Sequence, residues 1–65
     1  MSGTYYPQVL KLMREHGCEQ RTGGKGSHEK WWSPRSERVV IVPRSLKSRH
    51  TANSVLKDLG IDVKF

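Results

Sequence analysis

The sequence feature that most constrains the fold is a dense run of β-branched residues, Arg38-Val39-Val40-Ile41-Val42. Branched side chains pack well on a pleated strand, and Pro43, which has no backbone N–H, marks the end of this one. Residues 27–33 include two tryptophans and predict a second strand. Because residues 33–36 (Ser33-Pro34-Arg35-Ser36) are a turn signal, the two strands are expected to pair as an antiparallel hairpin.

A helix is predicted on either side of the strands. Residues 6–16 carry apolar side chains at helical spacing, with Pro7 in the first turn and Gly17 at the expected C-cap. The last helix is expected to follow Thr51 as its N-cap and to end at Gly60. Its apolar stripe, spaced i, i+3, i+4 and i+7, consists of Ala52, Val55, Leu56 and Leu59.

These segments predict a single α+β domain over residues 1–65, in the order αβββα. Residues 18–22 are expected to form a short first strand, which the glycines at 23, 24 and 26 interrupt. Two amphipathic helices can cover one face of a three-stranded antiparallel sheet, which leaves the other face and the loop ends open for contact. Residues 61–65 either pack on an apolar edge or stay loose.

The charge of the chain points to a polyanionic partner. Twelve Lys and Arg residues stand against six Asp and Glu residues, a formal net charge of +6. Such a field on a small domain favours nucleic acid, then an acidic protein, then an anionic membrane surface, unless the charge serves only solubility. We find no apolar run near the ~20 residues that span a bilayer. With no signal-peptide pattern and a lone cysteine, we expect a cytoplasmic protein without a membrane anchor.

A basic, glycine-rich segment at residues 23–28 ends in His28, directly before the aromatic strand. Glycines let the backbone approach a phosphate closely, Lys25 adds positive charge, and imidazole is the side chain whose ordinary pKa lies nearest neutrality. The segment is therefore a candidate place to hold a phosphodiester and to move a proton beside it. The alternative for His28 is an exposed histidine at the start of a strand.

The motifs, taken in this order, resemble those of the HicA-type toxins of bacterial toxin–antitoxin systems. The resemblance extends from Val9 to Ile61. Val9-Leu10-Lys11-Leu12-Met13 followed by Gly17 is similar to the first helix of the family, and Lys25-Gly26-Ser27-His28 with Trp31 three residues later is similar to its signature. Val40-Ile41-Val42-Pro43 resembles its third strand, and residues 51–61 resemble its last helix. The chain departs from the family in an extra glycine within residues 22–25, a short 43–51 connection and a cysteine at position 18.

The resemblance implies a fold like that of a double-stranded-RNA-binding domain. It implies a ribonuclease that needs no metal or other cofactor, attacks messenger RNA and arrests translation. It also implies that His28 is catalytic, that Trp31 is the core member of the tryptophan pair, and that a HicB-type antitoxin masks the site.

The chemistry of RNA cleavage suits a single histidine. RNA carries its own nucleophile, the 2′-hydroxyl, so the enzyme needs a base, an acid and positive charge on the phosphate. His28 is expected to serve as the base or the acid. The six carboxylates are scattered along the chain and no Cys/His spacing suits zinc, so we expect no metal site. Glu29 follows His28 and points to the opposite face, so we expect a surface or hairpin-pairing role for it.

Other basic and aromatic side chains extend the candidate RNA surface. Because successive strand residues alternate in direction, Trp32 shares a face with His28 and Lys30, where it either stacks on a base or covers the sheet edge. Ser27 either donates to phosphate or holds the turn. His50, in the basic loop 44–50, is either a second acid–base group or a solvated residue. The residues predicted to bind RNA are Lys25, Gly26, Ser27, Lys30, Trp32, Arg44, Lys47 and Arg49.

Two rival functions remain open at this point. The first is a non-catalytic RNA-binding module of the same fold, which basic charge and aromatic residues would fit equally well. The second is a protein whose only role is to bind an acidic partner. His28 and its loop favour the enzyme over both.

Overall fold

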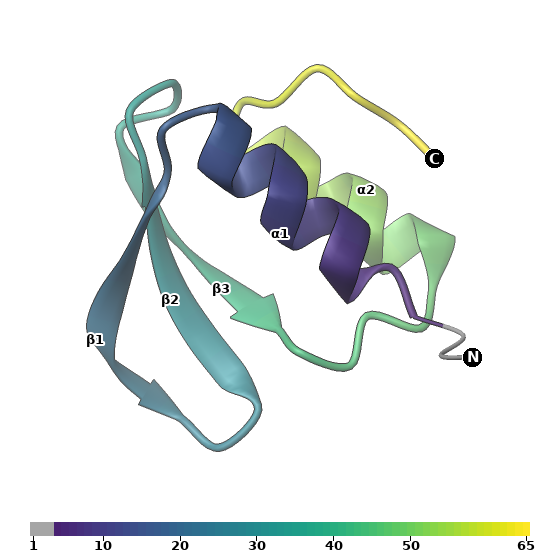
Figure 1. Cartoon of the computed structure of the whole chain (residues 1–65), viewed down its shortest axis with the longest axis horizontal. Helices are drawn as coiled ribbons and strands as arrows, with labels where there is room; N and C mark the ends of the chain where they lie inside the picture. The colour runs from purple at the N-terminus through teal and green to yellow at the C-terminus, as the bar shows by residue number, and fades with distance from the viewer. Residues whose placement is uncertain (1–3) are drawn as a thin grey trace.

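The computed structural model of the chain describes residues 4–65, which form two helices and three strands. In chain order the elements are α1 (Tyr6–Glu15), β1 (Glu19–Lys25), β2 (His28–Ser33), β3 (Arg38–Pro43) and α2 (Arg49–Asp58) (Figure 1). This order confirms the predicted αβββα arrangement of the α+β class.

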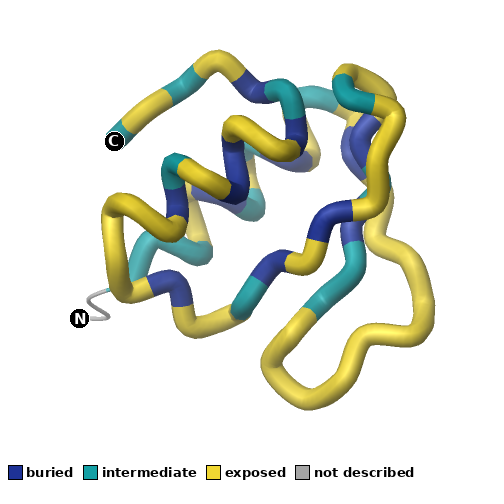
Figure 2. The backbone as a smooth tube through the Cα atoms, turned by 180° about the vertical axis from the view of Figure 1, so that it is seen from behind, coloured by how far each residue is buried: buried dark blue, intermediate teal, exposed yellow. Residues whose placement is uncertain are grey.

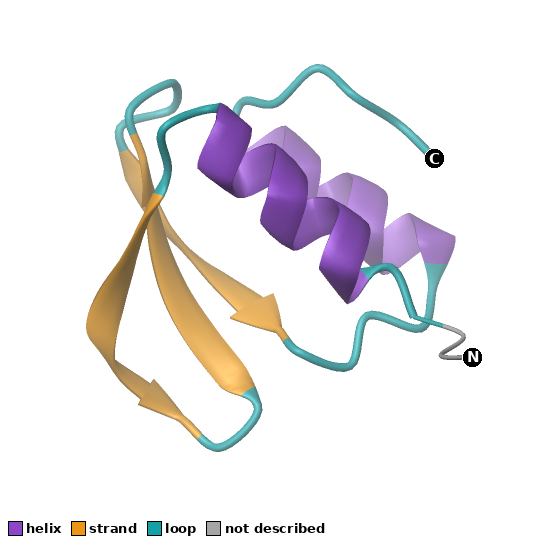
Figure 3. Cartoon of the chain, viewed as in Figure 1, coloured by secondary structure: helices purple, strands orange, loops and turns teal. Residues whose placement is uncertain are grey.

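The three strands form one antiparallel sheet in which β2 is the central strand. The predicted hairpin is the β2–β3 pair, where Trp31 lies opposite Val40 and Trp32 lies opposite Val39. Both helices lie on the same side of the sheet, as Figure 3 shows. The prediction of one covered face and one open face is therefore confirmed.

The core fills the space between the helices and the covered face of the sheet. Period-2 alternation selects its strand residues: Trp31, Val40 and Val42 are buried, whereas Val39 and Ile41 are about half exposed. Figure 2 shows the same alternation of buried and exposed positions along the backbone. The helices and loops complete the core with Val9, Met13, Cys18, Leu46, Ala52, Val55, Leu56, Leu59 and Ile61. The predicted apolar stripe of the last helix is thus buried along its whole length.

The start of α2 differs from the prediction. The N-cap is Ser48, whose hydroxyl accepts a hydrogen bond from the Thr51 backbone N–H, so the helix begins one turn earlier than expected. Both residues belong to the types that cap helices well, and Ser48 has the extended backbone that an N-cap requires. Arg49 and His50 consequently lie in the first turn of α2 and not in a loop.

The first strand and the C-terminal segment are also more ordered than the sequence indicated. Strand β1 continues through the glycines to Lys25, because an irregularity between Arg21 and Lys25 absorbs them without ending the pairing with β2. At the other end of the chain, the Asn53 side chain accepts from the Phe65 backbone N–H, and the Phe65 ring packs 5.1 Å from that of Tyr5. Residues 61–65 therefore pack against the helices.

Ser33 is a buried polar residue that joins the end of β2 to the end of α2. Its hydroxyl donates to the Leu59 carbonyl oxygen and accepts from the Arg35 backbone N–H. A single side chain thus pairs two backbone groups, one just after α2 and one in the β2–β3 turn. A buried backbone group left without a hydrogen-bond partner would lower the stability of the fold.

We expect Ser33→Ala to lower the free energy of unfolding by about 1–3 kcal/mol, because the Leu59 carbonyl loses its partner in a buried position. Urea unfolding followed by tryptophan fluorescence measures this loss. The matched control is Ser45→Ala at an exposed position, which should change stability by less than about 0.5 kcal/mol. Equal effects of the two substitutions would contradict the role given to Ser33.

Candidate functional site

A solvent-open pocket lies at the end of the sheet where β1 turns into β2, with a volume of about 530 Å³. Its walls come from β1, from the turn, from the first residues of β2 and from the residue that follows β3. The lining residues are Gln20, Arg21, Thr22, Gly23, Gly24, Gly26, His28, Glu29 and Arg44. Two strands, the turn between them and the residue after β3 therefore contribute to one pocket.

Glycine is favoured at positions 24 and 26 for two different structural reasons. A Cβ at position 24 would meet the backbone carbonyl oxygen of His28, so only glycine permits β1 to approach β2 so closely there. Gly26 has φ +56°, in the left-handed region, but open space lies where its Cβ would be. The close approach at Gly24 and the turn at Gly26 let Lys25 pair directly with His28 across the hairpin.

His28 begins β2 at the mouth of the pocket. Its side chain is exposed, and its backbone lies opposite Lys25 on β1 and Pro43 on β3. An imidazole in this position is open to solvent and can meet a ligand that enters the pocket from the open face of the sheet. The ring is exposed, and the pocket that it borders is also lined by Arg21 and Arg44.

Cationic side chains from β1, from β2 and from the residue after β3 border the same pocket as His28. The Arg44 backbone N–H donates to the Ser27 carbonyl oxygen at 2.7 Å, which places Arg44 beside the turn. Arg21 lines the pocket from β1. Lys30 reaches the same wall from β2, since its Nζ lies 3.3 Å from the position that a Cβ on Gly23 would occupy. The pocket is therefore suited to a phosphate group.

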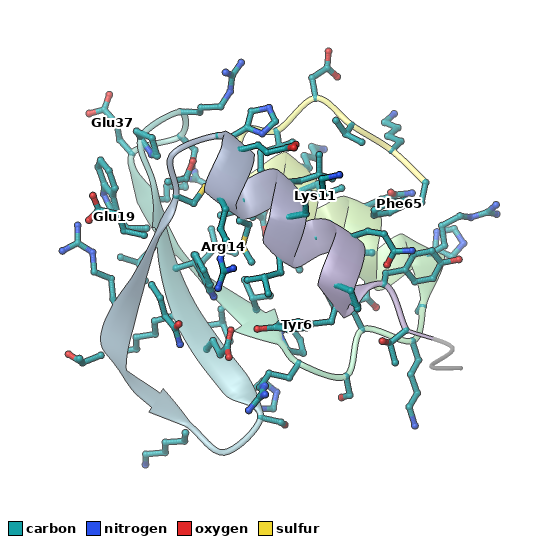
Figure 4. All side chains as sticks on the ribbon, viewed as in Figure 1. Tyr6, Lys11, Arg14, Glu19, Glu37 and Phe65 are labelled. Atoms are coloured by element: carbon teal, nitrogen blue, oxygen red, sulfur yellow. The ribbon has the colours of Figure 1, made fainter. Side chains whose placement is uncertain are left out.

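A carboxylate cluster supports one side of the pocket. Glu29 Oε1 accepts hydrogen bonds from the Tyr6 hydroxyl (2.7 Å) and from Trp31 Nε1 (3.0 Å), and Oε2 lies 3.5 Å from Arg44 Nε. The Glu29 side chain is only 14% exposed. Figure 4 shows Tyr6 extending from α1 toward the sheet. Burial, reinforced by the Glu29 hydrogen bond and charge, raises the pKa of Tyr6 above its ordinary value.

The expectation of a surface role for Glu29 was wrong, whereas its backbone does pair with Val42 in the β2–β3 hairpin. The signal that would have found it was present in the sequence, because Glu29 is two residues from Trp31 and therefore faces the core side of β2. A carboxylate on that side requires donors, and an indole and a phenol are the donors available. What the sequence did not show is that the first turn of α1 brings Tyr6 to this point.

The open face of the sheet continues from the pocket along β2. Lys30 lies opposite Ile41 and Trp32 lies opposite Val39, and these two aliphatic side chains are 48% and 53% exposed. The Arg21 guanidinium lies 5.4 Å from the centre of the Trp32 ring. The open face thus combines an apolar centre with a cationic margin.

Several predicted residues lie outside the pocket. Lys47 precedes α2 and Arg49 begins it, and neither lines the pocket. His50 borders a separate groove between α2 and the C-terminal segment. At the end of α1, His16 Nδ1 lies 2.8 Å from the Leu12 carbonyl oxygen. Cys18 is buried.

Two further observations concern residues 4–65 only. No group of three or more His, Cys, Asp and Glu side chains in this part of the chain could hold a metal ion. Neither helix has the length and apolar character needed to cross a membrane.

Comparison with known proteins identified one family. Residues 6–61 match the family model described as "HicA toxin of bacterial toxin-antitoxin". No curated protein and no solved structure matched the chain. The family match covers both helices and all three strands, and it includes every residue of the pocket.

We expect Gly24→Ala to lower the free energy of unfolding by more than about 2 kcal/mol, because the added methyl group displaces the His28 backbone. Gly26→Ala is the matched control: it adds a methyl group in open space and costs only about 1 kcal/mol for its positive φ. Urea unfolding followed by circular dichroism gives both values. A smaller loss at position 24 than at position 26 would contradict the close approach described here.

Proposed function

This chain belongs to the HicA family of toxins of bacterial toxin–antitoxin systems, and we propose that it is an endoribonuclease that cleaves messenger RNA without a metal ion and so inhibits translation. The observation that carries the proposal is the exposed His28 at the mouth of a pocket walled by glycine backbone and by Arg21 and Arg44. Such a pocket can hold a phosphodiester next to an imidazole, which can accept or donate a proton.

The proposed reaction uses the nucleophile of the substrate itself. The 2′-oxygen attacks the adjacent phosphorus, the bond from phosphorus to the 5′-oxygen breaks, and a 2′,3′-cyclic phosphate and a free 5′-hydroxyl result. His28 either takes the proton of the 2′-hydroxyl or gives a proton to the departing 5′-oxygen. Arg44 and Lys25 stabilise the negative charge that builds on the phosphate oxygens.

The rest of the RNA would follow the open face of the sheet. Lys30 continues the positive charge away from His28 along β2, and Trp32 offers an indole for stacking with a base, a contact worth about 1–3 kcal/mol. Gly26 and Ser27 form the turn beside the scissile phosphate. Lys47 and Arg49 lie outside the pocket and would contact the RNA backbone farther from the cleaved bond.

A HicB-type antitoxin is the proposed protein partner, and the open face is its proposed binding surface. Val39 and Ile41 offer exposed aliphatic area, which suits the apolar side chains of a protein better than the polar edges of a nucleotide. The cationic margin of Arg21 and Lys30 favours an acidic partner. Because this face is continuous with His28 on β2, a protein bound here would also cover the pocket.

We expect the purified chain to cleave RNA in the presence of EDTA and to leave 2′,3′-cyclic phosphate ends. His28→Ala should lower kcat/KM by about 10²–10⁴-fold, because the proton transfer is lost, while the fold and most of the RNA affinity remain. Gel electrophoresis of end-labelled RNA and a gel-shift assay measure the two properties. His50→Ala, which removes an exposed histidine from α2, is the control and should keep full activity.

Three results would contradict this function. Undiminished cleavage by His28→Ala would remove the site assignment, and a strict requirement for added magnesium would remove the mechanism. Binding of RNA by the wild type without any cleavage would identify the chain as an RNA-binding module of the same fold.

We expect the double variant Val39→Thr, Ile41→Thr to bind the antitoxin at least about 10-fold more weakly, because apolar contact area is replaced by hydroxyl groups. Threonine retains strand propensity, so the sheet should persist. Titration calorimetry with a HicB-type antitoxin measures the affinity, and RNA cleavage by the same variant is the internal control. An unchanged affinity would place the antitoxin on another surface.

A further inference from the structure

We propose that Glu29 is a positioning residue of this site, which holds the Arg44 guanidinium at the pocket that His28 also lines, where the scissile phosphate binds. The inference rests on the proposed function, because it concerns cleavage at His28. It goes beyond that function in giving a role to a carboxylate that faces away from His28 on the same strand.

The backbone of Arg44 is fixed next to the reacting centre. Arg44 directly follows Pro43, which lies opposite His28 in the β2–β3 register. Its N–H donates to the Ser27 carbonyl oxygen at 2.7 Å, so the backbone is tied on the side of the turn as well. Its side chain lines the same pocket as His28, so both can contact a phosphate that binds there.

The side chain of Arg44 needs a separate restraint. It is 61% exposed, and an arginine free in solvent populates many rotamers, whose loss on binding opposes catalysis. Glu29 Oε2 lies 3.5 Å from Nε, and the Tyr6 ring centre lies 6.0 Å from the guanidinium carbon. These contacts use Nε and the flat face of the guanidinium. The two Nη groups, which carry four N–H donors, are then available to a phosphate.

Glu29 is itself held by the core. Its Oε1 accepts from the Tyr6 hydroxyl on α1 and from the Trp31 indole on β2, and the side chain is 14% exposed. Since both donors lie on Oε1, Oε2 is left to face Arg44. The position of the guanidinium is therefore set by elements that belong to the folded core and not by the exposed turn.

The geometry favours positioning over direct catalysis. Successive residues of a strand point to opposite faces, so the Glu29 carboxylate does not share the face of the His28 ring. Oε1 is already occupied by two donors, and an unpaired carboxylate beside a phosphate would repel it. A purely structural role would need only one oxygen that accepts the hydrogen bonds from Tyr6 and Trp31, and a neutral glutamine also supplies that oxygen. The negative charge of the Glu29 carboxylate is needed only for the ion pair with Arg44.

The test is a double-mutant cycle between Glu29→Gln and Arg44→Ala, measured on RNA cleavage by the full chain. Glu29→Gln keeps an oxygen that accepts from Tyr6 and Trp31 and removes the ion pair alone, so we expect kcat to fall about 10-fold. Arg44→Ala should lower kcat about 100-fold, within the range for loss of one transition-state donor. In the Arg44→Ala background, Glu29→Gln should cause less than about a 2-fold further change. Ser33→Ala, destabilised at a distant position, is the control and should keep its kcat.

A second measurement needs no cleavage. In the wild type, the Arg44 Nε–H resonance in ¹⁵N NMR should be resolved and should shift when a 2′-O-methyl RNA, which lacks the nucleophile, is added. In Glu29→Gln the same resonance should broaden beyond detection through exchange with water. An unchanged Arg44 resonance in Glu29→Gln would overturn the positioning role.

The outcomes separate this inference from the function on which it rests. Equal effects of Glu29→Gln in the wild-type and Arg44→Ala backgrounds, or full activity of Glu29→Gln, would overturn the positioning role while cleavage at His28 stands. A wild-type chain that leaves RNA intact would overturn the proposed function, and the Arg44 resonance would still decide whether Glu29 holds the guanidinium.

Discussion

The alternation of side chains along β2 is the constraint on which the rest of this molecule depends. Trp31 and Ser33 point to the helices and are buried, whereas His28, Lys30 and Trp32 point to the open face. A shift of one residue in the pairing of β2 would bring the candidate site into the core and the core residues into solvent. The neighbouring strands prevent this shift, because β3 has its own buried and exposed sets in the same phase.

Glu29 connects the two sides of this arrangement. It lies on the core side of β2 but at the start of the strand, where the helices leave the sheet partly uncovered and Arg44 can reach it. Removing a carboxylate from water is costly, and two hydrogen bonds and an ion pair offset that cost. The same contacts couple α1 to the pocket, so in the proposed reaction the stability of the core and the placement of a phosphate-binding cation depend on one side chain.

The open face offers positive charge to one proposed partner, RNA, and apolar area to the other, the antitoxin. The net charge of +6 favours any polyanion, and in the proposed function the pocket holds a phosphodiester next to His28. Val39 and Ile41 contribute little to binding RNA but offer the apolar contact area that a protein partner requires. If both proposals hold, the catalytic surface and the protein-binding surface share one strand, and an antitoxin that covers this strand inhibits the toxin.

The sequence by itself determined the element types, their order and the burial of the Trp31 face, because β-branching, alternation and helical spacing act over a few residues. It also singled out His28 and its glycine turn, through a motif of adjacent residues. Only the tertiary structure decided that α2 begins after Ser48, that β1 continues to Lys25, and that Tyr6, Glu29 and Arg44 meet. These features could not be predicted from the sequence because each depends on how segments distant in sequence pack together. No local pattern specifies which donor on another element reaches a carboxylate.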